Sequence, residues 1–91
     1  MPRILTTKSY EHQLLKFRKK HPELRDQYYK TLKILEANPF HPSLRIHKLH
    51  GKLNVYHSVS INMQYLIMID FVIQDDMIIL LSIGGHGELG M

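Results

Sequence analysis

The chain has 91 residues, 44% of them hydrophobic and none of them cysteine, and its formal net charge is +4. This length and composition predict one globular domain over residues 1–91, and they exclude disulfides and thiolate chemistry. The apolar runs are too short to span a membrane and no signal peptide is recognisable, so we predict a cytoplasmic protein without a membrane partner. The positive charge favours an anionic partner such as nucleic acid, although many small domains carry such a charge without one.

The N-terminal part of the chain predicts a strand followed by two helices. Residues 3–7 are β-prone and can add an edge strand to a sheet. One helix is expected over about residues 9–20, with Ser9 as its N-cap, and a second over about 23–37, with Pro22 in its first turn. Each helix carries an apolar stripe, formed by Tyr10, Leu14 and Phe17 in the first and by Leu24, Tyr28, Leu32, Ile34 and Leu35 in the second.

Residues 55–85 hold most of the strongly β-forming sequence and predict three strands. Short turns at residues 62–63 and 74–76 separate the strands, and a pair of glycines at 84–85 ends the last one. Connections this short join antiparallel neighbours, and the last two strands are apolar enough to be central. The fold class that follows is α+β, a two-helix hairpin packed on one face of a small antiparallel β-sheet.

Three groups of residues are candidates for chemistry. The first is a basic, histidine-rich segment whose cations can hold a phosphate while an imidazole moves protons, formed by Arg45, His47, Lys48, His50 and Lys52. The second is His57, which alternation puts on the face of Val59, and the third is His86, which follows the strand-ending glycines. Structural alternatives stay open for these groups: a solvated loop, a packed histidine and an incidental turn residue. The histidines lack metal-site spacing, so we expect no metal and no cofactor.

The order of elements and three local strings together resemble the RelE/ParE toxin superfamily of bacterial toxin–antitoxin systems. Residues 47–51 (HKLHG) look like the family's H-K/P-L-x-G segment. Residues 56–65 (YHSVSINMQY) resemble its Y-W/R-S-x-R-I/V-N-x-x-Y strand and turn, and residues 83–89 (IGGHGEL) are similar to its C-terminal I-G-T/S-H-D-E-V string. The likeness covers nearly the whole chain, and the histidines look most like those of the YafQ-like branch.

This resemblance implies a ribosome-dependent mRNA endonuclease, in which an RNA 2′-hydroxyl attacks the adjacent phosphate. It implies two partners, mRNA on the ribosome and a cognate antitoxin that blocks the toxin. Carried over to this sequence, the catalytic residues are His86 and His47 as acid–base candidates, with His57 in support. The RNA-binding residues are the cations Arg45, Lys48, Lys52, Lys19 and Lys20.

Four positions depart from the family pattern. Ser60 stands where many members have Arg or His, and Gln64 stands where YafQ-like members have a catalytic Asp. Leu66 replaces a frequent Arg and cannot offset phosphate charge, and Gly90 replaces a terminal aromatic residue. The departures support an alternative, a non-catalytic or ParE-like, gyrase-directed homologue that mainly binds its antitoxin. The histidines favour the nuclease, and the missing arginine favours the alternative.

Overall fold

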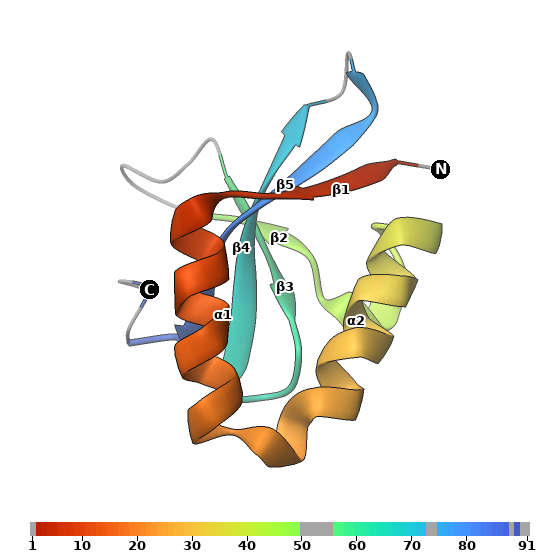
Figure 1. Ribbon diagram of the computed structural model, residues 1–91. Helices are drawn as coiled ribbons and strands as arrows, with labels where there is room; N and C mark the ends of the chain where they lie inside the picture. The colour runs from red at the N-terminus through yellow and green to blue at the C-terminus, as the bar shows by residue number, and fades with distance from the viewer. Residues whose placement is uncertain (1, 50–55, 73–74, 88, 90–91) are drawn as a thin grey trace.

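The computed structural model describes residues 2–49, 56–72, 75–87 and 89 (Figure 1). Its elements in chain order are β1 (Arg3–Thr6), α1 (Lys8–Lys20), α2 (Arg25–Ala37), β2 (His47–Lys48), β3 (His57–Ser60), β4 (Tyr65–Val72) and β5 (Met77–Gly85). Short 3-10 turns span Pro22–Leu24 and Pro42–Leu44. His50, Lys52, Gln74 and Gly90, which the sequence analysis singled out, lie outside the described residues.

The strands form one sheet in the order β1-β5-β4-β3-β2, with β4 and β5 inside it as predicted. Strands β2 to β5 pair antiparallel with their neighbours, whereas β1 runs parallel to β5, from Arg3 opposite Met77 to Thr6 opposite Leu80. The sheet is therefore mixed. The short turns between β3, β4 and β5 dictate antiparallel pairing, but both helices lie between β1 and β5 in the chain, so no tight turn constrains the direction of β1.

Both helices lie on one side of the sheet and diverge from their connection towards the β4–β5 hairpin (Figure 1). Thr7, rather than the predicted Ser9, is the N-cap of α1: its backbone is extended and its hydroxyl accepts a hydrogen bond from the Tyr10 N–H at 3.1 Å. The predicted second helix begins with a separate 3-10 turn at Pro22, and α2 proper starts at Arg25.

The core lies between the helices and the sheet, as the apolar stripes predict. Phe17 and Leu35 are buried there, and Leu14 and Leu32 are partly buried around them. The sheet contributes one face of each central strand, formed by Val59 and Ile61, by Ile67 and Ile69, and by Ile78, Leu80 and Ile83. None of the described helices is long and apolar enough to cross a membrane.

Candidate functional site

The sheet face opposite the helices carries a row of side chains that crosses four strands. His47 on β2 pairs with Ser58 on β3, Ser58 pairs with Met68 on β4, and Met68 pairs with Ser82 on β5. Alternation assigns this row to the open face, because Val59, Ile67 and Ile69 next to it face the helices. A β-bulge between Met68 and Ile69 shifts the register and brings Ser82 into the row.

His47 is exposed but held by two partners. Its Nδ1 lies 3.2 Å from the Arg45 carbonyl oxygen, which can only accept a hydrogen bond, so Nδ1 carries the proton. The buried Ser58 hydroxyl lies 3.2 Å from Nε2 and 3.3 Å from Nδ1. Because Nδ1 is already a donor, the hydroxyl donates to Nε2. In the neutral ring, these contacts place the proton on Nδ1 and turn the basic nitrogen, Nε2, towards Ser58.

Two cations lie close to His47 in the chain, Arg45 before β2 and Lys48 within it. Arg45 has a left-handed backbone, with φ of 48°, and its guanidinium Nη1 lies 3.0 Å from the Met63 sulfur. Lys48 pairs with His57, which puts it on the helix side of β2. Both cations are exposed, so each is accessible to an anionic ligand.

His57 lies on the helix side of β3, as its alternation with Val59 predicts. Its ring meets Phe71 edge-on at 5.2 Å, and its Nδ1 is buried without a partner among the described residues. Burial lowers the pKa of His57, and the charges of Lys48 and His47 lower it further. His57 is thus on the opposite face from Ser58 and the basic nitrogen of His47, and its supporting catalytic role stays a prediction.

His86 follows β5 at the other end of the sheet. Gly85 pairs with Tyr65, and after the exposed His86 the chain turns back so that the Leu89 N–H donates to the Gly85 carbonyl at 3.2 Å. By strand spacing, the backbones of His47 and His86 are separated by about 14 Å across the sheet and about 13 Å along it. The two histidines are too far apart for direct contact, so a substrate would have to bridge them.

A basic cleft of about 390 Å³ lies beside the C-terminal turn. The last turns of α1 supply three lysines to its lining, Lys16, Lys19 and Lys20. Leu89 and Ile83 supply apolar lining on the opposite side. The structure therefore places the predicted RNA-binding residues Lys19 and Lys20 next to the segment that carries His86.

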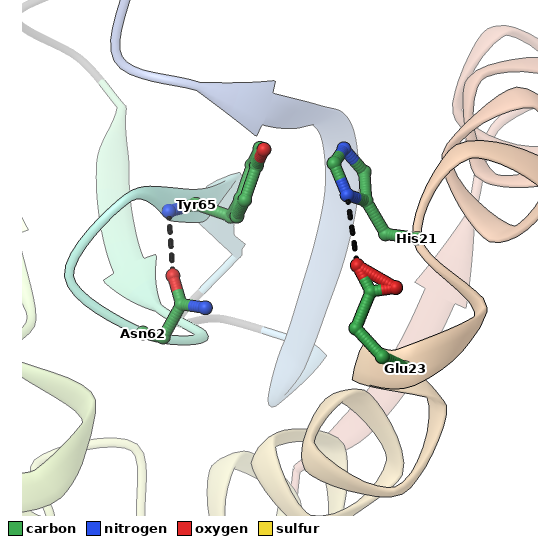
Figure 2. A network of polar contacts seen from close by, with 4 residues as sticks. All are labelled: His21, Glu23, Asn62 and Tyr65. Atoms are coloured by element: carbon green, nitrogen blue, oxygen red, sulfur yellow. Dashed lines mark hydrogen bonds and ion pairs between the residues drawn. The ribbon is translucent and has the colours of Figure 1, made fainter.

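His21 also lines this cleft and was missed by the sequence analysis. Its ring stands 4.5 Å from the Tyr65 ring and its Nδ1 lies 3.3 Å from a Glu23 carboxylate oxygen, while the Asn62 side chain accepts a hydrogen bond from the Tyr65 N–H (Figure 2). A histidine directly after a helix that ends in lysines is the only sequence signal for this position.

The open sheet face is poor in charge at its centre. In the row beside the His47 row, Ser60 pairs with Leu66 and Leu66 pairs with Gly84. Leu66 is only 1% exposed, so it is packed at the position where the family pattern has an arginine. The described parts of these two rows contain no arginine, lysine or acid, and no group of three His, Asp or Glu residues in the described chain is placed to hold a metal ion.

Comparison with solved structures places this geometry among known folds. No family model and no curated protein sequence matches the chain. A metal-bound toxin from Helicobacter pylori is 26% identical, with a TM-score of 0.81 over 98% of this chain and 99% of that one. YafQ from E. coli is 13% identical, with a TM-score of 0.80 over the whole of both chains. A YoeB/ParE toxin from Agrobacterium tumefaciens is 12% identical, with a TM-score of 0.76 over 92% of this chain and 98% of that one.

The chain has the RelE/ParE toxin fold. This confirms the resemblance stated from the three sequence strings and the α+β class. YafQ of this RelE/ParE group is also known in complex with DinJ, a structure that matches with a TM-score of 0.78 over the whole of both chains at 13% identity. Within the RelE/ParE fold of this chain, His47 and the serine row lie on the open face, Arg45 lies just before β2, and His86 follows β5 beside the α1 lysines.

Proposed function

We propose that this chain is the toxin of a type II toxin–antitoxin system and that it cleaves mRNA on the ribosome. The fold and its toxin neighbours support the first part. One observation carries the second: His47 is exposed, its neutral tautomer is set by the Arg45 carbonyl, and the Arg45 cation is close by in the chain. An imidazole in that state is suited to accept a proton at neutral pH.

The proposed reaction needs only side chains and RNA. The RNA 2′-hydroxyl replaces the Ser58 hydroxyl as the donor to His47 Nε2, which takes the proton of the 2′-hydroxyl. The 2′-oxygen forms a bond to the adjacent phosphorus, and the P–O5′ bond breaks. His86 donates a proton to the departing 5′-oxygen, which leaves a 2′,3′-cyclic phosphate and a free 5′-hydroxyl. Arg45 and Lys48 on one side and Lys19 and Lys20 on the other would hold the phosphates and offset the negative charge that develops.

The proposed partners are a cognate antitoxin and mRNA in the ribosome, both in the cytoplasm. The DinJ–YafQ complex supports an antitoxin partner for this fold. The excess of positive charge supports an anionic substrate. Under the same proposal, Lys52 binds RNA and His57 supports catalysis.

Induction of the chain and its variants in one host tests the nuclease. We expect the wild type to arrest growth and to cut translated mRNA, mapped by primer extension, with a loss of about 10²–10⁴-fold in cleavage for His47→Ala and for His86→Ala. His12→Ala is the matched control, because His12 is an exposed histidine on α1 that belongs neither to the His47 row nor to the lining of the basic cleft. Cleavage by both variants at the wild-type rate would refute the assignment.

The charge-poor centre of the open face favours a second candidate, the non-catalytic or ParE-like toxin homologue. In that case the wild type cuts no mRNA but still binds its antitoxin, or it inhibits DNA supercoiling by gyrase. Leu66→Arg is a poor test of this alternative, because Leu66 is buried and an arginine there would be an unpaired buried charge. Met68→Arg is better, because Met68 is half-exposed and pairs directly with Ser58.

A further inference from the structure

A second pocket, distant from His86 and on the helix side of the sheet, differs in kind from the basic cleft. It has a volume of about 540 Å³ and lies where the end of α2, the N-terminal segment and the β4–β5 hairpin meet. Its lining is mostly apolar and aromatic. The lining residues include Pro39, Phe40, His57, Phe71, Asp76 and Ile78. This size and lining are typical of binding sites for ligands or for anchoring side chains.

The aromatic rings form an open platform. The rings of Phe40 and Phe71 are stacked, with 6.0 Å between centroids and 16° between planes, and His57 meets Phe71 edge-on. Phe40 is 72% exposed, which is costly for a phenylalanine that serves only to pack. The ring face that Phe40 leaves open to solvent is therefore available to a partner.

The pocket has an acidic lining residue, whereas the chain as a whole has a positive net charge. Three of the chain's eight acidic residues belong to this hairpin, Asp70 on β4 and Asp75 and Asp76 directly before β5, and of these only Asp76 lines the pocket. No lysine or arginine among the described residues lines it, whereas the neighbouring hollows on α1 are lined by several. Lys48 on β2 pairs with His57 on β3, but Lys48 does not line the pocket.

An aromatic surface beside a carboxylate selects for cations. The faces of aromatic rings attract guanidinium and ammonium groups, and a nearby acid adds to that attraction. A phosphate-bearing ligand such as RNA would be repelled by Asp76. We propose that this aromatic pocket is a second binding site, which takes an arginine or lysine side chain of a partner protein, with an apolar part of that partner packed on Phe40. The proposal is independent of whether His47 and His86 cut RNA.

Two small probes that differ only in charge test this site. Benzoyl-arginine amide offers an aromatic group and a guanidinium, and benzoyl-citrulline amide has nearly the same shape without the charge. In ¹H–¹⁵N spectra of the full chain, we expect the arginine probe to shift the amides of Phe71, Val72 and Ile78, and to bind about two- to fivefold more tightly than the citrulline probe. Phe40→Ala should weaken both probes by about two- to tenfold, and the fold should tolerate this truncation because the Phe40 side chain is exposed.

The hairpin supplies a matched pair of variants. Asp76→Asn should remove the preference for arginine over citrulline, and Asp75→Asn, one residue away and outside the wall, should leave it intact. Asp76 has φ of 50°, a conformation that asparagine adopts with little strain, so the substitution tests charge. Equal binding of the two probes, shifts confined to the open sheet face, or stronger binding of adenosine monophosphate at this pocket would each overturn the proposal.

Discussion

At the scale of single residues, the contacts of His47 with Arg45 and Ser58 decide which ring nitrogen carries the proton and which one accepts. The Arg45 carbonyl makes Nδ1 a donor, and the Ser58 hydroxyl then donates to Nε2. We predict that Ser58→Ala shifts the ratio of the two neutral tautomers by about two- to tenfold, the value of one neutral hydrogen bond. The imidazole ¹⁵N shifts of His47 measure this ratio without any activity assay.

Ser60→Ala is the control for this prediction. Ser60 lies on the same strand and face as Ser58 but pairs with Leu66, and its hydroxyl makes no hydrogen bond to a described histidine. An unchanged tautomer ratio in Ser58→Ala would mean that the Arg45 carbonyl alone orients His47. Ser58 would then be a small residue that only makes room for the ring.

A second residue-scale feature is the buried pair of tyrosines that joins the helices. The hydroxyls of Tyr10 and Tyr28 lie 2.8 Å apart in the core. Burial raises the pKa of Tyr10, and it also raises the pKa of Tyr28. The unfolded chain therefore loses these protons first, so the free energy of unfolding is unaffected below about pH 10 and falls as the pH rises above it.

We predict that this alkaline loss of stability has a slope of up to about 1.4 kcal/mol per pH unit for each of the two tyrosines. Denaturant melts at a series of pH values measure it. The double variant Tyr10→Phe, Tyr28→Phe should flatten the slope, because it removes both titrating groups together. Tyr29→Phe, at a position 42% exposed, should leave the slope unchanged. A flatter slope in Tyr29→Phe would mean that the alkaline effect is not specific to the buried pair.

At the scale of elements, the two helices depend on the sheet for their stability. Leu35 of α2 is fully buried, so Leu35→Ala should lower the free energy of unfolding by about 2–5 kcal/mol. Leu32 is only partly buried, and its truncation should cost less. Leu15→Ala on the 60% exposed side of α1 is the control, expected within about 0.5 kcal/mol of the wild type. Equal losses of unfolding free energy in Leu15→Ala and Leu35→Ala would mean that the packing faces of the helices are assigned wrongly.

The same elements mark how far the sequence predicts this fold. The helical stripe that contains Leu32 and Leu35 can be recognised in the sequence, because an apolar period of about 3.6 residues indicates an amphipathic helix. Thr7 and Ser9 are both good caps, and only the backbone geometry decides between them. Strands β4 and β5 are apolar on both faces, so their alternation is hidden, and the burial of Leu66 on the open face was not foreseen.

The sequence marks candidate residues one by one but not their arrangement, and their roles stay predictions. His47 and His86 are conspicuous in the sequence, and the structure puts each where a substrate can reach it. The bulge at Met68 and Ile69 has no sequence signal, yet it determines that Ser82 joins the His47 row. The aromatic pocket joins Phe40, after α2, to Phe71 and Asp76 of the β4–β5 hairpin, and no local pattern predicts that these two parts of the chain meet.

At the scale of the whole molecule, the four described cations that we predict to bind RNA form two separate groups. Lys19 and Lys20 end α1, which packs on β5, and Arg45 and Lys48 lie at the opposite edge of the sheet on and before β2. Three strand spacings, about 14 Å, separate β5 from β2. An RNA that contacts both groups must cross the sheet, and a short oligonucleotide can contact only one of them.

This geometry predicts how binding depends on salt and on RNA length. For a single-stranded RNA long enough to cross the sheet, the slope of log affinity against log salt should fall by about one unit for Lys19→Ala and again for Lys48→Ala, because each lysine that contacts a phosphate releases one counterion. Fluorescence anisotropy at several salt concentrations measures both slopes. Lys33→Ala, an exposed lysine on α2, should leave the slope unchanged. With a short RNA, only one of the two substitutions should matter. If all three lysines change the slope equally at both lengths, binding follows net charge alone, and neither group is a phosphate-binding surface.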